Sequence, residues 1–229
     1  MEAIVLAGGF GKRLQSKIKN IPKPMAPINE KPFLDYIFRF LIRNKIKKVI
    51  LSVFYEYQKI IDHYGNKYKS LEIIYSIDKK ELGTGGAIKN ALFLCNSDNV
   101  FILNGDTYFD VDLNSLYKEH IKNNYDITLS LKPMRKINRY GLVETNTFMQ
   151  VVSFQSNKYS NYGTIDGGIY LIKNNLFKSK KNDKKFSFNN YIEQSLESLK
   201  IGSLVCNSVF IDIGIPKDYD KAHNILLDK

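Results

Sequence analysis

Short apolar runs alternate with segments of helical periodicity through the first half of the chain. An apolar run of about four to eight residues is typical of a buried strand, whereas apolar residues that recur every three or four positions predict an amphipathic helix. The predicted strands span residues 3–7, 49–53, 71–75 and 100–103. The predicted helices span residues 33–43, 56–64, 87–94 and 113–122. This alternation predicts an α/β fold with a doubly wound, mostly parallel, Rossmann-like sheet, in which ligands gather at the carboxyl ends of the strands.

In the second half the pattern changes to strands with little helix between them. The predicted strands span residues 127–131, 142–144, 149–154 and 164–172, and a last β-rich run spans residues 203–211. Two further helices are predicted at residues 188–199 and 216–227. Closely spaced strands favour an antiparallel extension, which could form the wall of a second substrate pocket. No internal repeat or low-complexity linker divides the chain, so we expect one domain over residues 1–229, with two halves that meet near residue 125.

The composition is that of a globular protein. Of the 229 residues, 44% are hydrophobic and 13% aromatic, which excludes wholesale disorder. No apolar stretch approaches the ~18 residues of a membrane-spanning helix, and the first residues lack the pattern of a secretory signal. We therefore expect a cytoplasmic protein with no membrane partner. Cys95 and Cys206 belong to no C-x-x-C motif or zinc ligand set, and we interpret both as small hydrophobic residues.

The net charge of +11 indicates an anionic partner. Nucleic acid would suit this charge, but the lysines are scattered, and no RNA-binding aromatic motif, helix-turn-helix pattern or zinc finger accompanies them. We therefore expect no nucleic-acid partner. Small phosphorylated substrates suit the same charge.

Three glycines and two cations directly follow the first predicted strand. Gly8, Gly9 and Gly11 allow a ligand to approach the main chain closely, and Lys12 and Arg13 add positive potential to the free N–H groups of the loop. This combination predicts a site for a phosphate chain. The alternative is a glycine-rich connection that binds no ligand.

Two common phosphate motifs do not fit this loop. A Walker A loop would need glycine at Leu6 and serine or threonine at Arg13, and the dinucleotide fingerprint would need glycine at Leu14. A third cation, Lys23, stands between Pro22 and Pro24, and the fixed φ angles of the prolines predict that Lys23 is held stiffly.

Two carboxylates are candidates for a metal site. Asp106 comes just after the predicted strand 100–103, where ligands gather, and Mg²⁺ is commonly held by one or two carboxylates together with phosphate oxygens. The alternative at Asp106 is a turn in which the side chain only caps the backbone. Asp212 has apolar neighbours on both sides, so it needs a partner or an ion. The glycine-rich run 83–86 precedes a predicted helix and would let a flat base lie against its backbone.

Five motifs occur in the order and spacing of the sugar-1-phosphate nucleotidylyltransferases, which the chain resembles over almost its whole length. They are Leu6-Ala7-Gly8-Gly9-x-Gly11-x-Arg13-Leu14, Pro22-Lys23-Pro24-Met25, Leu82-Gly83-Thr84-Gly85-Gly86, Asn104-Gly105-Asp106 and Asp212-Ile213-Gly214-x-Pro216. Within that family, the segments 104–113 and Arg139-Tyr140-Gly141 look most like the D-glycero-D-manno-heptose 1-phosphate guanylyltransferases.

The resemblance implies that GTP and a heptose 1-phosphate give GDP-heptose and pyrophosphate, for surface polysaccharide synthesis. It implies that Arg13 holds the departing pyrophosphate, that Lys23 holds the reacting phosphates, and that Asp106 and Asp212 hold Mg²⁺. The attacking phosphate oxygen is already anionic, so the reaction needs positioning and charge neutralisation rather than a general base. The absence of a candidate catalytic histidine fits this chemistry.

The resemblance also assigns the two substrates to the two halves. The nucleotide would bind the first half through Leu6, Ala7, Gly8, Gly9, Gly11, Lys12, Gly83, Thr84, Gly85, Gly86, Asn104 and Gly105. The sugar phosphate would bind the second half through Tyr140, Gly141, Asp166 and Gly167. Either Asp78 or Glu81 could accept hydrogen bonds from guanine, and family membership makes a homodimer reasonable.

The chain departs from the family pattern on the sugar side. Phe154-Gln155-Ser156-Asn157 stands where the family has Phe-x-Glu-Lys, and Asp166-Gly167-Gly168 where it has Asn-x-Gly. Lys12 occupies a position that is often threonine or serine. Three alternatives therefore stay open: the same reaction with mannose 1-phosphate and GTP or with an amino sugar phosphate and UTP, a nucleotide-sugar-binding regulator without turnover, and a basic nucleic-acid binder.

Overall fold

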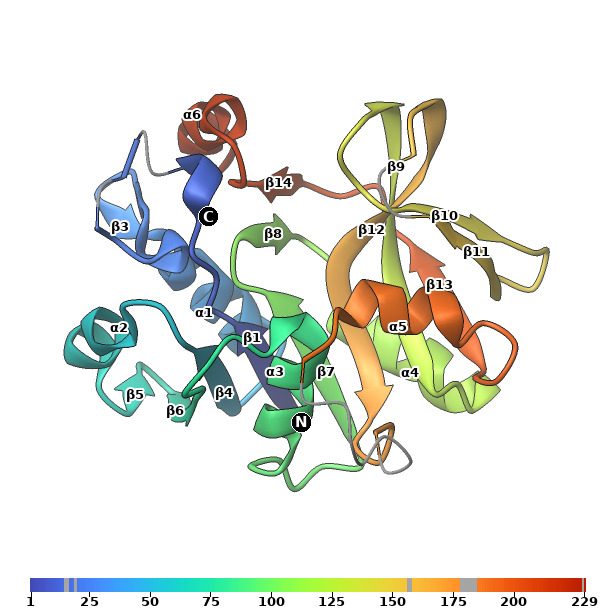
Figure 1. Cartoon of the computed structure of the whole chain (residues 1–229), viewed down its shortest axis with the longest axis horizontal. Coiled ribbons are helices and arrows are strands. Elements are labelled where there is room, and N and C mark those ends of the chain that lie inside the picture. The colour runs from blue at the N-terminus through green and yellow to red at the C-terminus, as the bar shows by residue number, and fades with distance from the viewer. Residues whose placement is uncertain (15–16, 19, 156–157, 178–184, 228) are drawn as a thin grey trace.

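Four parallel strands form the N-terminal half of the central sheet in the computed structural model, which describes residues 1–14, 17–18, 20–155, 158–177, 185–227 and 229 (Figure 1). In spatial order they are β7 (Asn99–Asn104), β1 (Glu2–Leu6), β4 (Lys48–Val53) and β6 (Leu71–Ile77). Each pairs in parallel with its neighbour, and the short antiparallel strand β5 (Lys67–Tyr68) closes the edge. The predicted parallel α/β sheet is confirmed.

Antiparallel strands extend this sheet on the other side of β7. The long strand β12 (Ser160–Lys173) pairs with β7 and so joins the two halves of the chain. The remaining strands of the extension are β9 (Ile127–Ile137), β10 (Leu142–Thr145), β11 (Val151–Gln155) and β13 (Ile201–Val205). β10 and β9 both pair with β12, β11 pairs with β10, and β13 lies parallel to β9.

The β-rich run predicted over residues 203–211 forms more than one strand. This run forms two strands, β13 in the large sheet and β14 (Phe210–Asp212), which pairs with β8 (Thr107–Phe109) in a separate two-stranded sheet. Asn207 and Ser208 interrupt the run, and Lys132 Nζ donates hydrogen bonds to the Asn207 side chain and the Ser208 carbonyl. The break matters because it directs β14 towards β8.

Helices cover both faces of the sheet. They are α1 (Phe33–Arg43), α2 (Tyr57–Tyr64), α3 (Gly83–Leu92), α4 (Leu113–Asn123), α5 (Phe188–Gln194) and α6 (Pro216–Ile225). Two 3-10 turns, η1 (Lys12–Leu14) and η2 (Lys23–Met25), and the hairpin of β2 (Pro27–Ile28) with β3 (Lys31–Pro32) connect β1 to α1.

Three helices have boundaries that differ from the prediction by more than one residue. The helix predicted at 87–94 begins at Gly83, so the glycine-rich run is its first turn rather than a loop before it. The helix predicted at 188–199 ends at Gln194, after which the Ser195 N–H donates to the Ile192 carbonyl, three residues back, and residues 195–198 form turns. The C-terminal helix ends two residues early, at Ile225.

Successive residues of the parallel strands are buried on opposite faces. Val5 packs in a cluster with α1, whereas Ile4 packs in a second cluster with α3 and α5. Residues 100–103 are at most 1% exposed, which confirms the predicted burial on both faces. Cys95 is buried and free, as expected for a small hydrophobic residue. No helix in the described part of the chain is long and apolar enough to span a membrane.

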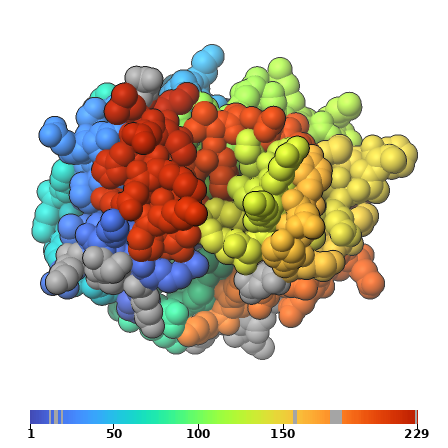
Figure 2. Space-filling view, turned by 90° about the horizontal axis from the view of Figure 1, so that it is seen from above, coloured from blue at the N-terminus to red at the C-terminus, as the bar shows by residue number. Residues whose placement is uncertain are grey.

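The C-terminal segment returns to the N-terminal part of the chain. The Tyr219 hydroxyl donates to the Pro27 carbonyl at 2.5 Å, and the Asn29 side chain donates to the His223 carbonyl at 2.8 Å. Figure 2 shows the C-terminal segment spread over the surface between the N-terminal residues and the strands of the extension. This path places Asp212 opposite Thr107, the neighbour of Asp106, in the β8–β14 pair.

Candidate active site

A cavity lies at the carboxyl ends of the four parallel strands, where the sequence predicts ligands to gather. Its volume of about 340 Å³ lies in the range of small-molecule sites. Leu6 ends β1, Ser52 is near the end of β4, Asp78 directly follows β6, and Asn104 ends β7, and all four line the cavity. Each of the four parallel strands β7, β1, β4 and β6 therefore contributes to the cavity.

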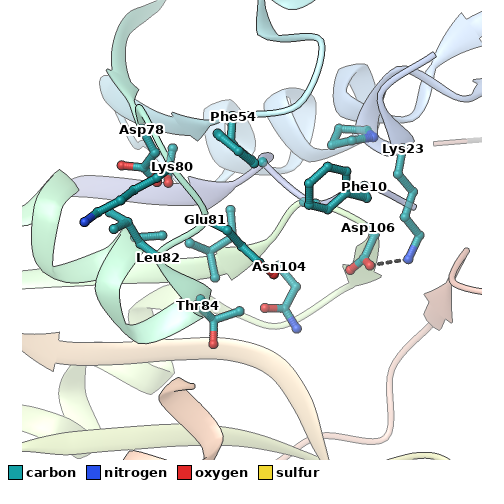
Figure 3. Close-up of a pocket in the computed structure, with 18 residues that line it drawn as sticks. Phe10, Lys23, Phe54, Asp78, Lys80, Glu81, Leu82, Thr84, Asn104 and Asp106 are labelled. Atoms are coloured by element: carbon teal, nitrogen blue, oxygen red, sulfur yellow. Dashed lines mark hydrogen bonds and ion pairs between the residues drawn. The ribbon is translucent and has the colours of Figure 1, made fainter. Parts of the chain in front are cut away.

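The two ends of the cavity differ in chemistry. Lys23 and Asp106 lie at one end and contact each other, whereas Asp78 and Lys80 lie at the other (Figure 3). The cavity wall between them includes the backbone of Gly8 and Gly9. An elongated ligand with an anionic end and a polar end matches this arrangement.

Lys23 connects the two candidate metal ligands. Its side chain is 9% exposed, and its Nζ contacts Asp106 Oδ2 and lies 4.0 Å from Asp212 Oδ1. Burial would raise the pKa of Asp106, but the Lys23 ammonium outweighs burial and lowers it. Burial and the neighbouring Asp106 charge raise the pKa of Asp212. Asp106 and Asp212 therefore share one buried cation, the ammonium group of Lys23.

Arg139 holds the second oxygen of Asp212. Its Nη1 donates to Asp212 Oδ2 at 2.8 Å, and its Nη2 donates to Asp218 Oδ2 at 2.6 Å. The guanidinium carbon lies 4.4 Å from the centre of the Tyr140 ring, in a cation–π contact. On its other oxygen, Asp212 accepts a hydrogen bond from the Gly214 N–H at 2.6 Å. Asp212 is thus fixed at both oxygens.

Comparison with known proteins supplies the family. The model of the nucleotidyl transferase family matches residues 2–229. The chain is 45% identical to the D-glycero-alpha-D-manno-heptose 1-phosphate guanylyltransferase of Aneurinibacillus thermoaerophilus, over 99% of this chain and 98% of the relative. The chain belongs to the nucleotidyl transferase family. The protein of the same name from Campylobacter jejuni is 44% identical, over 96% of this chain and 97% of that protein.

A solved structure resembles this nucleotidyl transferase over nearly its whole length. HddC from Yersinia pseudotuberculosis, in a crystal structure described as complexed with GMP-PN, superimposes with a TM-score of 0.87 at 32% identity. The match covers 98% of this chain and 99% of HddC. The fold of this nucleotidyl transferase is therefore that of HddC.

Seven of the twelve residues predicted to bind nucleotide line the cavity of this nucleotidyl transferase. They are Leu6, Gly8, Gly9, Gly83, Thr84, Asn104 and Gly105. Ala7, Gly85 and Gly86 are buried behind it, and Lys12 opens η1. Gly11 has a φ of 59° and lies against Lys23, where an added Cβ would be 3.1 Å from the lysine Cβ. The glycine therefore allows the backbone of η2 to approach the loop.

Arg13 does not line the cavity. It lies in η1 and is exposed, whereas Lys23 lines the cavity directly. Of the two cations predicted to be catalytic, the structure brings only Lys23 to the two carboxylates. The predicted role of Arg13 towards pyrophosphate stays a prediction.

The start of α3 is shaped by packing against residues 185–188. The Gly85 N–H donates to the Phe186 carbonyl at 3.0 Å, and the Phe188 N–H donates to Thr84 Oγ1 at 2.8 Å. A Cβ on Gly85 would lie 2.2 Å from the Phe186 ring. These contacts explain Gly85 without a ligand, and they position Gly83 and Thr84 at the cavity.

The four residues predicted to bind sugar lie outside this cavity. Asp166 accepts hydrogen bonds from the Tyr170 hydroxyl at 2.5 Å and from the Gly168 N–H at 3.0 Å. An added Cβ at Gly167 would lie 2.5 Å from Phe109, so packing explains this glycine. Gly141 lies near Asp166, and Tyr140 contacts Arg139. Their contact with a sugar stays a prediction, and Ser156 and Asn157 lie outside the described residues.

Sequence reasoning missed two kinds of site residue. Phe10 and Phe54 line the cavity edge to face, with ring centroids 5.6 Å apart, and Phe10 is the variable position of the first motif. Arg139 belongs to the motif Arg139-Tyr140-Gly141 but had no role assigned. Its contact with Asp212 depends on the loop between β9 and β10 and the end of β14, which meet only in the folded chain.

The donor set fits a magnesium ion that is completed by substrate. Across the described ranges, no group of three or more histidine, cysteine, aspartate or glutamate residues could hold a metal alone. Asp106 lines the cavity beside Lys23 and supplies one hard oxygen ligand. Asp212 lies outside the cavity lining, on the other side of Lys23, with its Oδ1 4.0 Å from Lys23 Nζ, and supplies the second. Mg²⁺ is commonly bound by one or two carboxylates with phosphate oxygens and water, so two are sufficient.

Proposed function

We propose that this nucleotidyl transferase joins GMP from GTP to D-glycero-D-manno-heptose 1-phosphate, giving GDP-heptose and pyrophosphate. The observation that carries the proposal is the two-ended cavity, with Lys23 and Asp106 at one end and Asp78 at the other. A nucleoside triphosphate has a matching anionic end and polar base. The names of the Aneurinibacillus and Campylobacter relatives support the guanylyl and heptose assignments.

The residues suit an in-line displacement at the α-phosphorus. An anionic oxygen of the sugar phosphate forms a bond to the α-phosphorus, and the bond from that phosphorus to the oxygen of the β-phosphate breaks, releasing pyrophosphate. No proton is transferred, so no general base is needed. Lys23 neutralises phosphate charge, and the N–H groups of Gly8 and Gly9 line the path of the triphosphate. Mg²⁺ bound by Asp106 and Asp212 would supply further charge neutralisation.

Asp78 is the better candidate for reading guanine. It lines the cavity and is 7% exposed, and its Oδ1 accepts a hydrogen bond from Asn90 at 2.8 Å. Guanine presents two donors, N1–H and the N2 amino group, to which a carboxylate is a suitable acceptor. Glu81 also lines the cavity, but its side chain is 58% exposed and forms an ion pair with Lys185 at 2.6 Å. This difference in burial favours Asp78 over Glu81.

The enzyme would act in the cytoplasm, and its product would serve surface polysaccharide synthesis. These parts of the proposal rest on the heptose assignment and on the expectation from the sequence. A homodimer also stays a prediction.

Release of pyrophosphate by the purified protein tests the reaction. With GTP, Mg²⁺ and the heptose 1-phosphate, we expect release that depends on all three. Mannose 1-phosphate with GTP, and an amino sugar phosphate with UTP, separate the alternatives that keep the reaction. Binding of GDP-heptose without release from any pair would instead indicate a regulator, and would overturn the enzymatic proposal.

A further inference from the structure

A lysine ammonium occupies the space between the two carboxylates proposed to bind metal. Lys23 Nζ contacts Asp106 Oδ2 and lies 4.0 Å from Asp212 Oδ1 (Figure 3). The Lys23 side chain is 9% exposed and that of Asp212 is 16% exposed, so water screens these two charges only weakly, whereas the Asp106 side chain is 34% exposed towards the cavity. Without a cation between them, two neighbouring carboxylates would repel each other.

The surrounding backbone holds the ammonium in place. Pro22 and Pro24 flank Lys23 in η2, and the stem of its side chain lies against Gly11. On the opposite side, the turn after β14 encloses Nζ, because a Cβ on Gly214 would lie 3.3 Å from it and 2.7 Å from Asp212 Oδ1. The ammonium is therefore a built part of the cluster and not a surface charge that happens to be near.

The ammonium and a divalent cation would use the same oxygens. Asp212 Oδ2 is committed to Arg139, and its Oδ1 is the oxygen nearest to Lys23. Asp106 Oδ2 is the oxygen that contacts Lys23. A metal ion that binds both carboxylates would therefore lie beside Lys23 Nζ, and the two positive charges would repel each other.

We infer that Lys23 is an exchangeable internal counter-ion, which occupies the metal position in the free protein and moves to the nucleotide phosphates when a divalent cation enters. The inference rests on the metal ligands of the proposed function. Moving a buried ammonium away from a carboxylate is unfavourable unless another anion receives it. The triphosphate is that anion, so divalent cation and nucleotide should each increase the affinity of the protein for the other.

Titration of Mn²⁺ into the nucleotide-free protein tests the exchange. By electron paramagnetic resonance or calorimetry, K23M should bind Mn²⁺ at least ~10-fold more tightly than the wild type, because the competing charge is gone. K23R should bind as weakly as the wild type. K80M is the matched control, since Lys80 lines the other end of the same cavity, and it should leave Mn²⁺ affinity unchanged.

A second titration includes a measurement on the wild type alone, which keeps the inference testable if K23M folds poorly. A non-hydrolysable GTP analogue should increase the Mn²⁺ affinity of the wild type, and this increase should be smaller in K23M. The double variant K23M/D106N should lose the tighter binding of K23M. Equal or weaker Mn²⁺ binding by folded K23M, or no effect of the analogue on the wild type, would overturn the inference.

These results are independent of the test of function. If wild-type protein releases pyrophosphate but K23M binds Mn²⁺ like the wild type, the exchange is wrong and the enzymatic proposal stands. If K23M binds Mn²⁺ more tightly but the wild type releases no pyrophosphate from any substrate pair, the exchange stands and the enzymatic proposal falls.

Discussion

Arg139 donates a hydrogen bond of 2.8 Å to Asp212, and this contact joins the two halves of the active site. Arg139 lies between β9 and β10, beside the predicted sugar-binding Tyr140, whereas Asp212 ends β14. The second arm of the guanidinium reaches Asp218 in α6 at 2.6 Å. One side chain therefore connects the sugar-side loop, a proposed metal ligand and the C-terminal helix.

Replacing Arg139 should lower both kcat and the free energy of unfolding. R139Q leaves Asp212 and Asp218, each 16% exposed at the side chain, without their shared cation. We expect kcat to fall at least ~10-fold and the free energy of unfolding to fall by about 2 kcal/mol. R139K keeps the charge but cannot donate to both carboxylates in the same geometry, so it should be intermediate. Steady-state kinetics and thermal unfolding measure the two effects.

The matched control is Arg135, an exposed residue of β9. R135Q removes the same charge from the same strand region and should leave kcat and thermal stability near the wild-type values. An R139Q enzyme with wild-type kcat would show that Asp212 does not need Arg139.

Replacement by alanine should reduce the stability of the protein at Gly85 but not at Gly9. A Cβ at Gly85 would lie 2.2 Å from the Phe186 ring, which also packs on Phe177 and Tyr191 and has little room to move. We expect G85A to lose about 1–3 kcal/mol of stability by overpacking. A Cβ at Gly9 meets no atom within 4 Å, so G9A should unfold like the wild type.

The kinetic effects of the same two variants separate packing from ligand contact. Gly9 lines the cavity, so G9A should raise the KM for GTP while leaving the melting temperature unchanged. Thermal unfolding and initial rates at varied GTP give both quantities. A G85A protein as stable as the wild type would mean that the Phe186 ring moves away from the added methyl group at little cost in free energy.

Local patterns predicted the parallel part of this structure because its interactions are local or repeated. The run 100–103 is apolar throughout and is buried on both faces. Asp106 could be predicted as a site residue because it comes just after that strand. The division of residues 203–211 was not predictable in this way, since β13 pairs with β9 and β14 with β8, both far away in the sequence.

The choice between Asp78 and Glu81 also depended on distant residues. Both follow β6, and both are carboxylates near the glycine-rich run. Lys185, which pairs with Glu81 at the surface, comes from the other half of the chain. The sequence predicted both carboxylates as candidates, and both line the cavity, whereas tertiary contacts determine that Asp78 is buried and Glu81 exposed.

His120 should make stability fall in mildly acidic solution. It is 1% exposed between Thr128 and Asn99, with ring nitrogens 2.8 and 3.0 Å from their side-chain oxygens. Burial, assisted by the nearby Lys173 charge, lowers the pKa of His120 from 6.5 to about 4. Because the unfolded chain takes up the proton first, stability is complete above about pH 6.5 and is lost as the pH falls towards 4.

The loss attributable to His120 approaches about 3 kcal/mol, at about 1.4 kcal/mol per pH unit. Urea denaturation at several pH values measures it. H120Q should be less stable at pH 7.5, because its amide cannot reproduce both contacts, and should show a weaker decline between pH 6.5 and 4. H63Q, at an exposed position of α2, should keep the wild-type pH dependence. An H120Q protein whose stability declines as steeply as the wild type would exclude His120 as the source.

Asp78 should determine the preference for guanine. D78N keeps an oxygen that can accept from Asn90, but it replaces the other acceptor with an amide donor, which would face the donors of guanine. We expect kcat/KM for GTP to fall about 100-fold, with a smaller change for ATP, because a site built to accept hydrogen bonds loses them selectively. E81Q should behave like the wild type, because Glu81 is exposed and paired with Lys185. Initial rates with both nucleotides provide the comparison, and an unchanged ratio of GTP to ATP in D78N would assign guanine recognition to other residues.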